Sequence, residues 1–432
     1  MLKVLELYSG IGGMHWALKE IGLPYKVVLA VDINTTANSI YKHNFPDVNL
    51  QSLGIEKISL KMIESLSINT ILMSPPCQPF TRVGKKGDCN DVRTKSFLHL
   101  LQILIQLKEK PLYILVENVK GFEVSQTRQK LVEFLVAGGY TFQEFLLTPL
   151  QFGIPNCRLR YYMIAKFKKP FCFVCQSQIL TDIPASSTPE HTACSNRIRN
   201  LDNTSYDAMN TISDSQITVQ GLPPKTSKRT EEDDILQPIE ESAVHDVELP
   251  KFISPNLLKE AGRNMRYCEE EDNFITDTSH SLSDYTEEGS SDYFEEYLLS
   301  DKDLKLFVIM DIVYPALKKS ICFTKRYGHY IEGAGSVLQM TSDVECVRAA
   351  SRLKSQVVHN KTKDQMGEAE LEILRRLQLR YFTPREVANL LCFPPTFDFP
   401  PGLTRIQKYR VLGNSLNVHV VAKLVQLMTR EA

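Results

Sequence analysis

Apolar runs alternate with amphipathic patterns through the first 170 residues of the chain. Residues 93–109 and 125–137 carry apolar side chains at helical spacing and predict two helices. Strands separated by helices indicate an α/β fold with a mostly parallel, doubly wound sheet, in which ligands bind beyond the carboxyl ends of the strands. The predicted strands are residues 3–7, 27–31, 69–73, 112–116, 141–148 and 161–167.

The periodic pattern stops after residue 170, and Ser, Thr, Asn, Asp and Glu dominate as far as residue 300. This composition predicts a smaller variable region with a flexible acidic loop over residues 231–300. Apolar periodicity returns near Tyr314 and predicts a helix over residues 365–380.

Two helix starts are encoded near the C-terminus. Thr383, Pro384 and Glu386 have the pattern of a capping box with proline at the first helical position. Asn414 and Ser415 can cap a final apolar helix that begins at Leu416.

The net charge of −1 conceals an uneven distribution. Residues 231–300 hold 20 Asp and Glu against 4 Lys and Arg, a net of −16, which leaves 46 basic and 31 acidic residues elsewhere, a net of +15. A basic body suits a polyanionic partner such as nucleic acid. The same distribution also fits a solvated acidic loop on a mildly basic enzyme.

The ten cysteines are scattered through a chain whose N-terminus reads as a β-strand and not as a signal peptide. We therefore expect a reducing compartment, the cytoplasm or also the nucleus, where a special cysteine is catalytic or metal-binding. No apolar run approaches the ~20 residues that a membrane span needs, so we expect no membrane partner.

A glycine-rich turn directly follows the first predicted strand. It reads LYSGIGG from Leu7 to Gly13, and glycines let a backbone turn tightly and approach a ligand closely. Asp32 ends the second strand, where a carboxylate can accept hydrogen bonds from ribose hydroxyls. The two features together indicate a nucleoside cofactor, whereas the turn alone fits a plain tight turn equally well.

Cys77 lies on a proline-bracketed loop, SPPCQPF, after the predicted strand 69–73. A single cysteine is most often a buried structural residue. Prolines restrict the backbone on both sides of Cys77, however, so the loop at this strand end is stiff. A purely structural cysteine fits such a loop badly. We therefore interpret Cys77 as a reactive thiol.

Charged residues mark two further strand ends. Glu117 follows the strand 112–116 and could be a solvated cap or a general acid beside Cys77. Arg158 and Arg160 occupy alternate positions before the next strand, so both can face one anionic group.

Four residues in the variable region have a spacing that a structural zinc site could use. They are Cys172, Cys175, His191 and Cys194. Incidental thiols in a variable segment are the stronger interpretation, so we expect no metal.

Together these motifs resemble the cytosine carbon-5 methyltransferases built on the DNA-methyltransferase plan. The matches run in the family's order: the glycine turn, Asp32, PPCQPF, ENV, RLR and a GNS sequence at Gly413. The resemblance is closer to the family's type-two homologue branch, which methylates transfer RNA, in ELYSGIGGMH, ENVKGFE, GIPNCRLRY, the CFT at Cys322 and LGNSLNVHVVAKL. Cys392 departs from the pattern, because the family often has glycine at this position.

The resemblance implies three regions. Residues 1–170 are expected to form the catalytic domain, and residues 171–380 a target-recognition region that contains the acidic loop. Residues 381–432 are expected to form C-terminal helices that return to the catalytic domain.

The resemblance also implies a reaction. A methyl group passes from S-adenosyl-L-methionine to carbon 5 of cytosine, leaving S-adenosyl-L-homocysteine, after Cys77 has added to carbon 6 of the ring. Glu117 is expected to hold the exocyclic amine and ring nitrogen 3, Arg160 to orient the base, and Arg158 to support Arg160 or a phosphate. The implied cofactor contacts are Ile11, Gly12, Gly13, Asp32, Ile55, Glu56, Ser74 and Ser415.

The implied substrate is cytosine 38 in the anticodon loop of aspartate transfer RNA, bound by a monomer. Two alternatives stay open: the same chemistry on DNA, and a nucleic-acid-binding protein without catalysis. The CFT segment and the lack of a long regulatory extension favour RNA. The intact set of Cys77, Glu117, Arg158 and Arg160 favours an enzyme.

Overall fold

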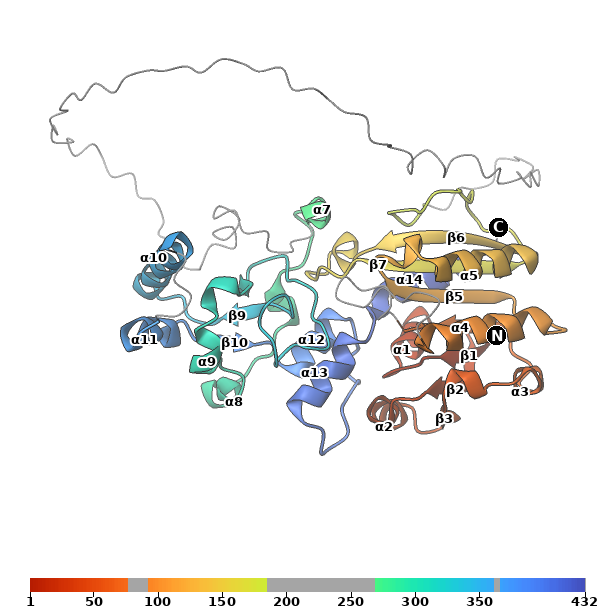
Figure 1. The fold of residues 1–432 in the computed structure, drawn as a ribbon, viewed down its shortest axis with the longest axis horizontal. Coiled ribbons are helices and arrows are strands. Elements are labelled where there is room, and N and C mark those ends of the chain that lie inside the picture. The colour runs from red at the N-terminus through yellow and green to blue at the C-terminus, as the bar shows by residue number, and fades with distance from the viewer. Residues whose placement is uncertain (77–91, 185–268, 361–365, 432) are drawn as a thin grey trace, which may run out of the picture. The chain divides into compact units, whose positions relative to one another are not determined.

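The computed structural model describes residues 1–76, 92–184, 269–360 and 366–431 (Figure 1). Its main feature is a seven-stranded sheet in the order β3-β2-β1-β4-β5-β7-β6. The strands are β1 Leu2–Leu7, β2 Tyr25–Asp32, β3 Leu50–Ser52, β4 Thr70–Met73, β5 Tyr113–Val119, β6 Tyr140–Leu147 and β7 Arg160–Phe167. The first five of these strands pair in parallel, and β7 lies antiparallel between β5 and β6, so the predicted doubly wound α/β sheet is confirmed.

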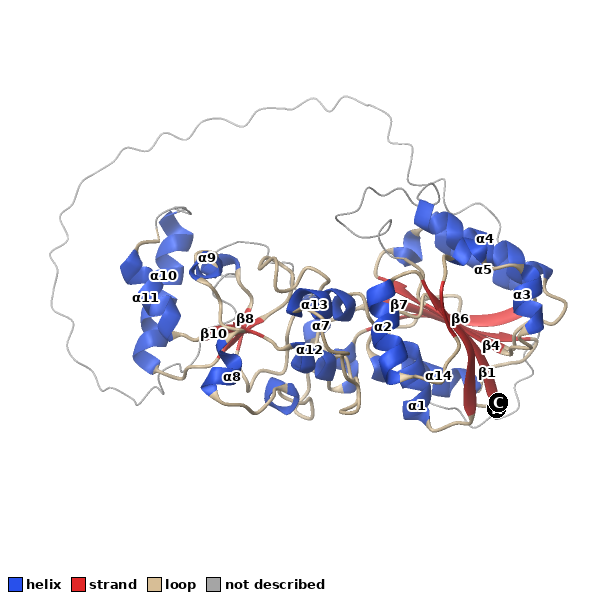
Figure 2. Ribbon diagram, turned by 90° about the horizontal axis from the view of Figure 1, so that it is seen from below, coloured by secondary structure: helices blue, strands red, loops and turns tan. Residues whose placement is uncertain are grey.

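Helices cover both faces of this sheet (Figure 2). Because successive strand residues point to opposite faces, Leu2 and Val4 of β1 pack in one hydrophobic cluster and Leu5 and Leu7 in the other. The first cluster includes α1 Gly13–Ile21, α2 Thr35–Asn44 and α14 Val418–Thr429. The second includes α3 Leu60–Ser65, α4 Val92–Gln106 and α5 Gln126–Ala137.

A second, three-stranded sheet is formed by β8 Ile312–Val313, β9 Val337–Gln339 and β10 Leu379–Tyr381. Strands β8 and β9 are parallel, and β9 and β10 are antiparallel. The remaining helices are α7 Glu269–Asp272, α8 Ser291–Glu295, α9 Asp301–Leu304, α10 Val344–Asn360, α11 Glu368–Arg376, α12 Pro384–Leu390 and α13 Arg405–Gly413. Within the described parts of the chain, no helix combines the length and apolarity needed to cross a membrane.

The predicted capping box at Thr383 is confirmed. The Thr383 hydroxyl accepts a hydrogen bond from the Glu386 N–H at 3.1 Å, and the Thr383 N–H donates to Glu386 Oε2 at 2.7 Å. Helix α12 therefore starts where the sequence predicts, with Pro384 in its first turn.

Two other C-terminal predictions need correction. The helix predicted over 365–380 is the shorter α11, because Gln378 adopts a left-handed conformation with φ of 50° and the chain continues as β10. The final helix starts at Val418 with Asn417 as its cap, since Asn414 instead closes the C-terminal end of α13.

Part of the acidic segment is folded. Within residues 279–291, Leu282 is fully buried and its N–H donates to the Leu317 carbonyl at 2.8 Å. The Glu287 N–H donates to Glu386 Oε1 at 3.0 Å. The expectation of a flexible loop is therefore wrong for these residues, because one buried leucine and local polar contacts hold a stretch whose composition is typical of loops. Residues 231–268 lie outside the described residues.

Candidate active site

The glycine turn is tied to the end of β2 by a carboxylate. Gly10 N–H donates to Asp32 Oδ2 and Asn34 N–H donates to Asp32 Oδ1, each at 2.8 Å. Burial raises the pKa of Asp32, and the backbone N–H donors only partly oppose that effect. Since an ionised carboxylate offers about four acceptor positions, Asp32 keeps capacity for a further donor.

The turn itself has the features of a ligand cradle. Gly12 has a φ of 86°, a left-handed conformation that a residue with a Cβ atom rarely adopts. The Ser9 hydroxyl is buried and lacks a hydrogen-bond partner among the described residues. An unsatisfied buried hydroxyl beside a glycine turn is consistent with a polar ligand that completes the site.

Two more predicted cofactor residues, Ser74 and Ser415, lie close to this turn, which ends at Gly13. A Cβ atom built on Gly13 would lie 3.3 Å from the Ser415 hydroxyl, so these two residues are neighbours. The Ser74 hydroxyl donates to the Tyr8 carbonyl at 3.4 Å, which brings the end of β4 to the turn. The structure therefore gathers segments that are more than 400 residues apart in the sequence.

The other predicted cofactor residues differ in exposure. Ile11 and Ile55 are buried in the two hydrophobic clusters on opposite faces of the sheet, so their side chains serve packing. Glu56 is exposed, and its carboxylate lies against Gly54.

Cys77 lies outside the described residues, which stop at Pro76 on this side of the gap. The loop that leads to it is held next to β5. Met73 pairs with Val116, and the Asn118 side chain donates to the Pro75 carbonyl at 3.3 Å. The structure therefore places the described part of the proline loop beside the strand that carries Glu117.

Glu117 is buried and faces a guanidinium group. Arg160 Nε lies 3.8 Å from Glu117 Oε1, and both side chains are mostly enclosed. Burial raises the pKa of Glu117 and outweighs the lowering effect of Arg160 and Arg158. Glu117 is therefore more readily protonated than an ordinary glutamate, which suits a carboxyl that gives a proton or a hydrogen bond to a ligand.

Arg158 and Arg160 have different surroundings, although they were predicted to face one anionic group. The Arg158 guanidinium is buried and donates to the carbonyls of Phe323 at 3.2 Å, Gly413 at 3.3 Å and Ser415. Arg160 faces Glu117. Arg158 therefore joins the start of β7 to two distant segments, and Arg160 is the arginine that borders the Glu117 carboxyl.

Cys322 is a member of this cluster that the sequence reasoning did not place among the site residues. Its sulfur lies 3.3 Å from Arg158 Nη1 and 3.5 Å from Arg160 Nη2. Burial raises the pKa of the Cys322 thiol, but the two guanidinium groups together bring it below its usual value. The CFT motif was the available signal, and no spacing rule could connect it to residues more than 160 positions away.

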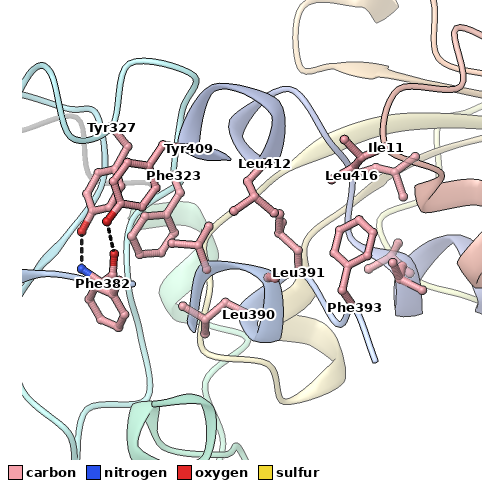
Figure 3. Close-up of a cluster of buried hydrophobic side chains, with 14 of the residues drawn as sticks. Ile11, Phe323, Tyr327, Phe382, Leu390, Leu391, Phe393, Tyr409, Leu412 and Leu416 are labelled. Carbon is pink, nitrogen blue, oxygen red and sulfur yellow. Dashed lines mark hydrogen bonds between the residues drawn. The ribbon is translucent and has the colours of Figure 1, made fainter. Parts of the chain in front are cut away.

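One hydrophobic cluster links the glycine turn to this second group of residues (Figure 3). Ile11 and Leu416 lie at one end of the view, Leu391 and Leu412 in the middle, and Tyr327 at the other end. The glycine turn and the arginine cluster therefore pack on the same hydrophobic cluster. Cys392, next to Leu391, has a φ of 61°, a left-handed conformation that favours glycine, the residue expected at this position from the family resemblance.

The zinc hypothesis gains no support from the described part of the chain. Cys172 and Cys175 are half-buried beside the first hydrophobic cluster. His191 and Cys194 lie outside the described residues. No group of three or more potential metal ligands occurs among the residues that are described.

Comparison with known proteins identifies the family. The model of the C-5 cytosine-specific DNA methylase family matches residues 2–430. The chain is 44% identical to the tRNA (cytosine(38)-C(5))-methyltransferase of Mus musculus over 429 residues, covering 99% of this chain and 93% of the relative. It is 35% identical to the DNA (cytosine-5)-methyltransferase of Dictyostelium discoideum over 435 residues, covering 99% and 94%.

A solved structure supports the same assignment. A mutant of Spodoptera frugiperda DNMT2 superposes with a TM-score of 0.70 at 35% identity, covering 100% of both chains. The chain therefore belongs to the C-5 cytosine-specific DNA methylase family, in the branch that contains the tRNA (cytosine(38)-C(5))-methyltransferases.

Proposed function

We propose that this protein methylates carbon 5 of cytosine 38 in transfer RNA, with aspartate tRNA as the expected substrate. The observation that carries the proposal is the 44% identity to the mouse tRNA (cytosine(38)-C(5))-methyltransferase over 99% of the chain. The cluster of Glu117, Arg158 and Arg160 supports it, because the charged residues that the reaction needs lie together.

The proposed methyl donor is S-adenosyl-L-methionine. It would supply an electrophilic methyl group, with S-adenosyl-L-homocysteine as the product. Asp32 would hold the ribose hydroxyls, and the N–H groups and buried Ser9 hydroxyl of the glycine turn would approach the rest of the molecule. Ser74 and Ser415 border the same turn and complete the proposed binding set.

Cys77 is the proposed nucleophile. Its thiolate adds to carbon 6 of cytosine, and the electron pair of the carbon 5–carbon 6 double bond then makes carbon 5 nucleophilic. After carbon 5 has taken the methyl group, a base removes its proton and the thiolate leaves carbon 6. A cytosine in an anticodon loop can leave its stack for this reaction at a lower cost than a paired base.

Glu117 and Arg160 would hold the cytosine during attack. The raised pKa of Glu117 favours its protonated form, which can donate to ring nitrogen 3 while the other carboxyl oxygen accepts from the exocyclic amine. Arg160 would position Glu117 and the base through its guanidinium. Arg158 would act indirectly, through the backbone carbonyls that it holds.

DNA is the alternative substrate, because a relative at 35% identity is named a DNA (cytosine-5)-methyltransferase.

We also propose that the protein acts as a monomer in the cytoplasm or nucleus. We further propose that the chain is divided into the catalytic, target-recognition and C-terminal regions expected from the sequence.

The test is methyl transfer from labelled S-adenosyl-L-methionine to three substrates side by side: a tRNA-Asp transcript, the same transcript with uracil at position 38, and duplex DNA. The proposal expects label in the first substrate alone. Label in DNA and none in the tRNA would overturn the substrate assignment.

A further inference from the structure

A surface loop leads directly away from the arginine cluster. Residues 324–334 follow Cys322 and Phe323, and the loop is closed at its base by a hydrogen bond from Thr324 N–H to the Ala334 carbonyl at 2.8 Å. Compact loops whose ends lie close together often carry binding functions.

The inner side of this loop is rigidly packed. Tyr327 is buried among Phe323, Tyr381 and Tyr409, with edge-on ring contacts at about 5 Å between centroids (Figure 3). Its hydroxyl donates to the Ser336 carbonyl at 2.6 Å and accepts from the Phe382 N–H at 2.8 Å. Local fluctuation of the loop is therefore opposed by both apolar contacts and hydrogen bonds.

A close backbone contact fixes the start of the loop. A Cβ atom on Gly413, the last residue of α13, would lie 2.2 Å from Lys325 N. Only glycine allows this approach. The Gly413 carbonyl in turn accepts from Arg158, so the loop and the arginine cluster are built on the same contacts.

The outer side of the loop presents an aromatic ring with an arginine and a histidine beside it. Tyr330 is 51% exposed, whereas Tyr327 on the same loop is buried. The Arg326 guanidinium lies over the Tyr330 ring at 5.1 Å from the centroid, and the His329 ring meets it edge-on at 4.7 Å. Both neighbours are exposed, and the N–H groups of His329 and Tyr330 both donate to the Arg326 carbonyl.

We infer that Tyr330 and Arg326 form a stacking platform for an unpaired base of the RNA substrate. This inference rests on the proposed function. Exposed aromatic rings and guanidinium planes are the surfaces on which proteins stack splayed-out RNA bases, and flanking cations attract the phosphates. An apolar protein partner would instead favour a platform without charged neighbours.

The position of the platform gives it a role in substrate recognition. It lies on the same short loop that begins beside Cys322, whose sulfur contacts both Arg158 and Arg160. A base stacked at Tyr330 would thus be held by a loop that is anchored to the proposed cytosine site. The platform positions the RNA and takes no part in bond formation.

The experiment measures binding of the full chain to a tRNA-Asp transcript without methyl donor, across a salt series. Four variants are compared: Tyr330→Ala, Tyr330→Phe, Arg326→Ala and, as a matched control, Tyr293→Ala. Tyr293 is another exposed tyrosine, at 41%, and lies on α8. Thermal unfolding of each variant checks that the fold is intact.

Tyr330→Ala is expected to raise Kd about tenfold, which corresponds to ~1.4 kcal/mol, whereas Tyr330→Phe keeps wild-type affinity because it keeps the ring. Arg326→Ala should weaken binding and reduce the dependence of log K on log salt by about one. Tyr293→Ala should bind as wild type does.

Equal tRNA affinity of folded Tyr330→Ala and wild-type protein would overturn the inference, even if wild-type protein methylates tRNA. If wild-type protein binds tRNA through Tyr330 but does not methylate it, the inference stands and the proposed function fails. A wild-type chain that does not bind RNA would overturn both.

Discussion

Glu117 shows how burial can prepare a single residue for chemistry. Two guanidinium groups lie near its carboxyl and favour the charged form, yet burial still raises its pKa. The site therefore holds a carboxyl that can act as a hydrogen-bond donor to a base while its arginine neighbours keep it in place.

Glu117→Gln should lower kcat by about 100-fold or more, since proton transfer by a positioned side chain contributes ~10²–10⁴. The amide can still accept and donate hydrogen bonds, so tRNA affinity should change little. Single-turnover methylation and tRNA binding measured on the same preparation separate the two effects. Unchanged single-turnover rates would remove Glu117 from the mechanism.

Asp32 combines an observed role with a proposed one. Its carboxylate holds Gly10 and Asn34 by their N–H groups, and its remaining acceptor capacity would serve the ribose of the proposed donor. Asp32→Ala should weaken binding of S-adenosyl-L-methionine by about 1.5–3 kcal/mol. Calorimetry checks this, and a dissociation constant equal to that of wild type would show that Asp32 does not contact the donor.

Among the elements, β7 has an arginine at its first position, Arg160, and another, Arg158, two residues before it, and the two differ in role. Arg158 connects β7 with residues 322–323 and with the junction between α13 and α14, through three backbone carbonyls. Arg160 borders Glu117. The alternate spacing predicted that both arginines face one anionic group. Spacing alone could not show that the Arg158 guanidinium donates to backbone carbonyls instead.

The two arginines should therefore respond differently to substitution. Arg158→Ala removes the donor to the buried Phe323 carbonyl and to two partly buried carbonyls. An unsatisfied buried acceptor costs ~1–3 kcal/mol, so the variant should lower the free energy of unfolding and activity together. Arg160→Ala should reduce kcat with a much smaller loss of stability. Chemical denaturation and methylation assays on both variants test this, and equal destabilisation by the two would contradict the division of roles.

At the scale of the whole molecule, the alternation of apolar strands with helices was enough to predict the doubly wound sheet, because buried parallel strands need long apolar runs. The glycine turn was predicted to follow β1, and it does; its binding of a cofactor stays a prediction. The Arg158–Cys322–Gly413 cluster could not be predicted from spacing, since it depends on contacts between segments more than 90 residues apart. Residues 279–291 were predicted to be a flexible loop because their overall composition is polar. Composition could not show that the one leucine among them, Leu282, is buried in the core.

The free energy of unfolding should change with pH because of Glu6. This residue lies in β1, on the face that packs against α1 and α2. Tyr41 Oη donates to Glu6 Oε2 at 2.7 Å, and burial raises the pKa of Glu6 from 4.5 to about 8. Between these values the folded protein retains a proton that the unfolded chain has released, so stability falls as pH rises.

Between pH 5 and pH 8 the free energy of unfolding of the wild type should fall by on the order of 3 kcal/mol relative to that of Glu6→Gln, since one pKa unit corresponds to ~1.4 kcal/mol. Denaturant titrations of both proteins at the two pH values measure the difference. Parallel pH dependence in the two proteins would show that Glu6 ionises normally.

The proposed mechanism requires a covalent bond between Cys77 and cytosine 38 of transfer RNA. The most direct measurement uses a tRNA transcript with 5-fluorocytosine at position 38, because fluorine at carbon 5 cannot leave as a proton does and the adduct is trapped. With S-adenosyl-L-methionine present, we expect a denaturation-resistant protein–RNA complex for the wild type and none for Cys77→Ala. An equal yield of the complex with Cys77→Ala, or no complex with an active wild type, would contradict it.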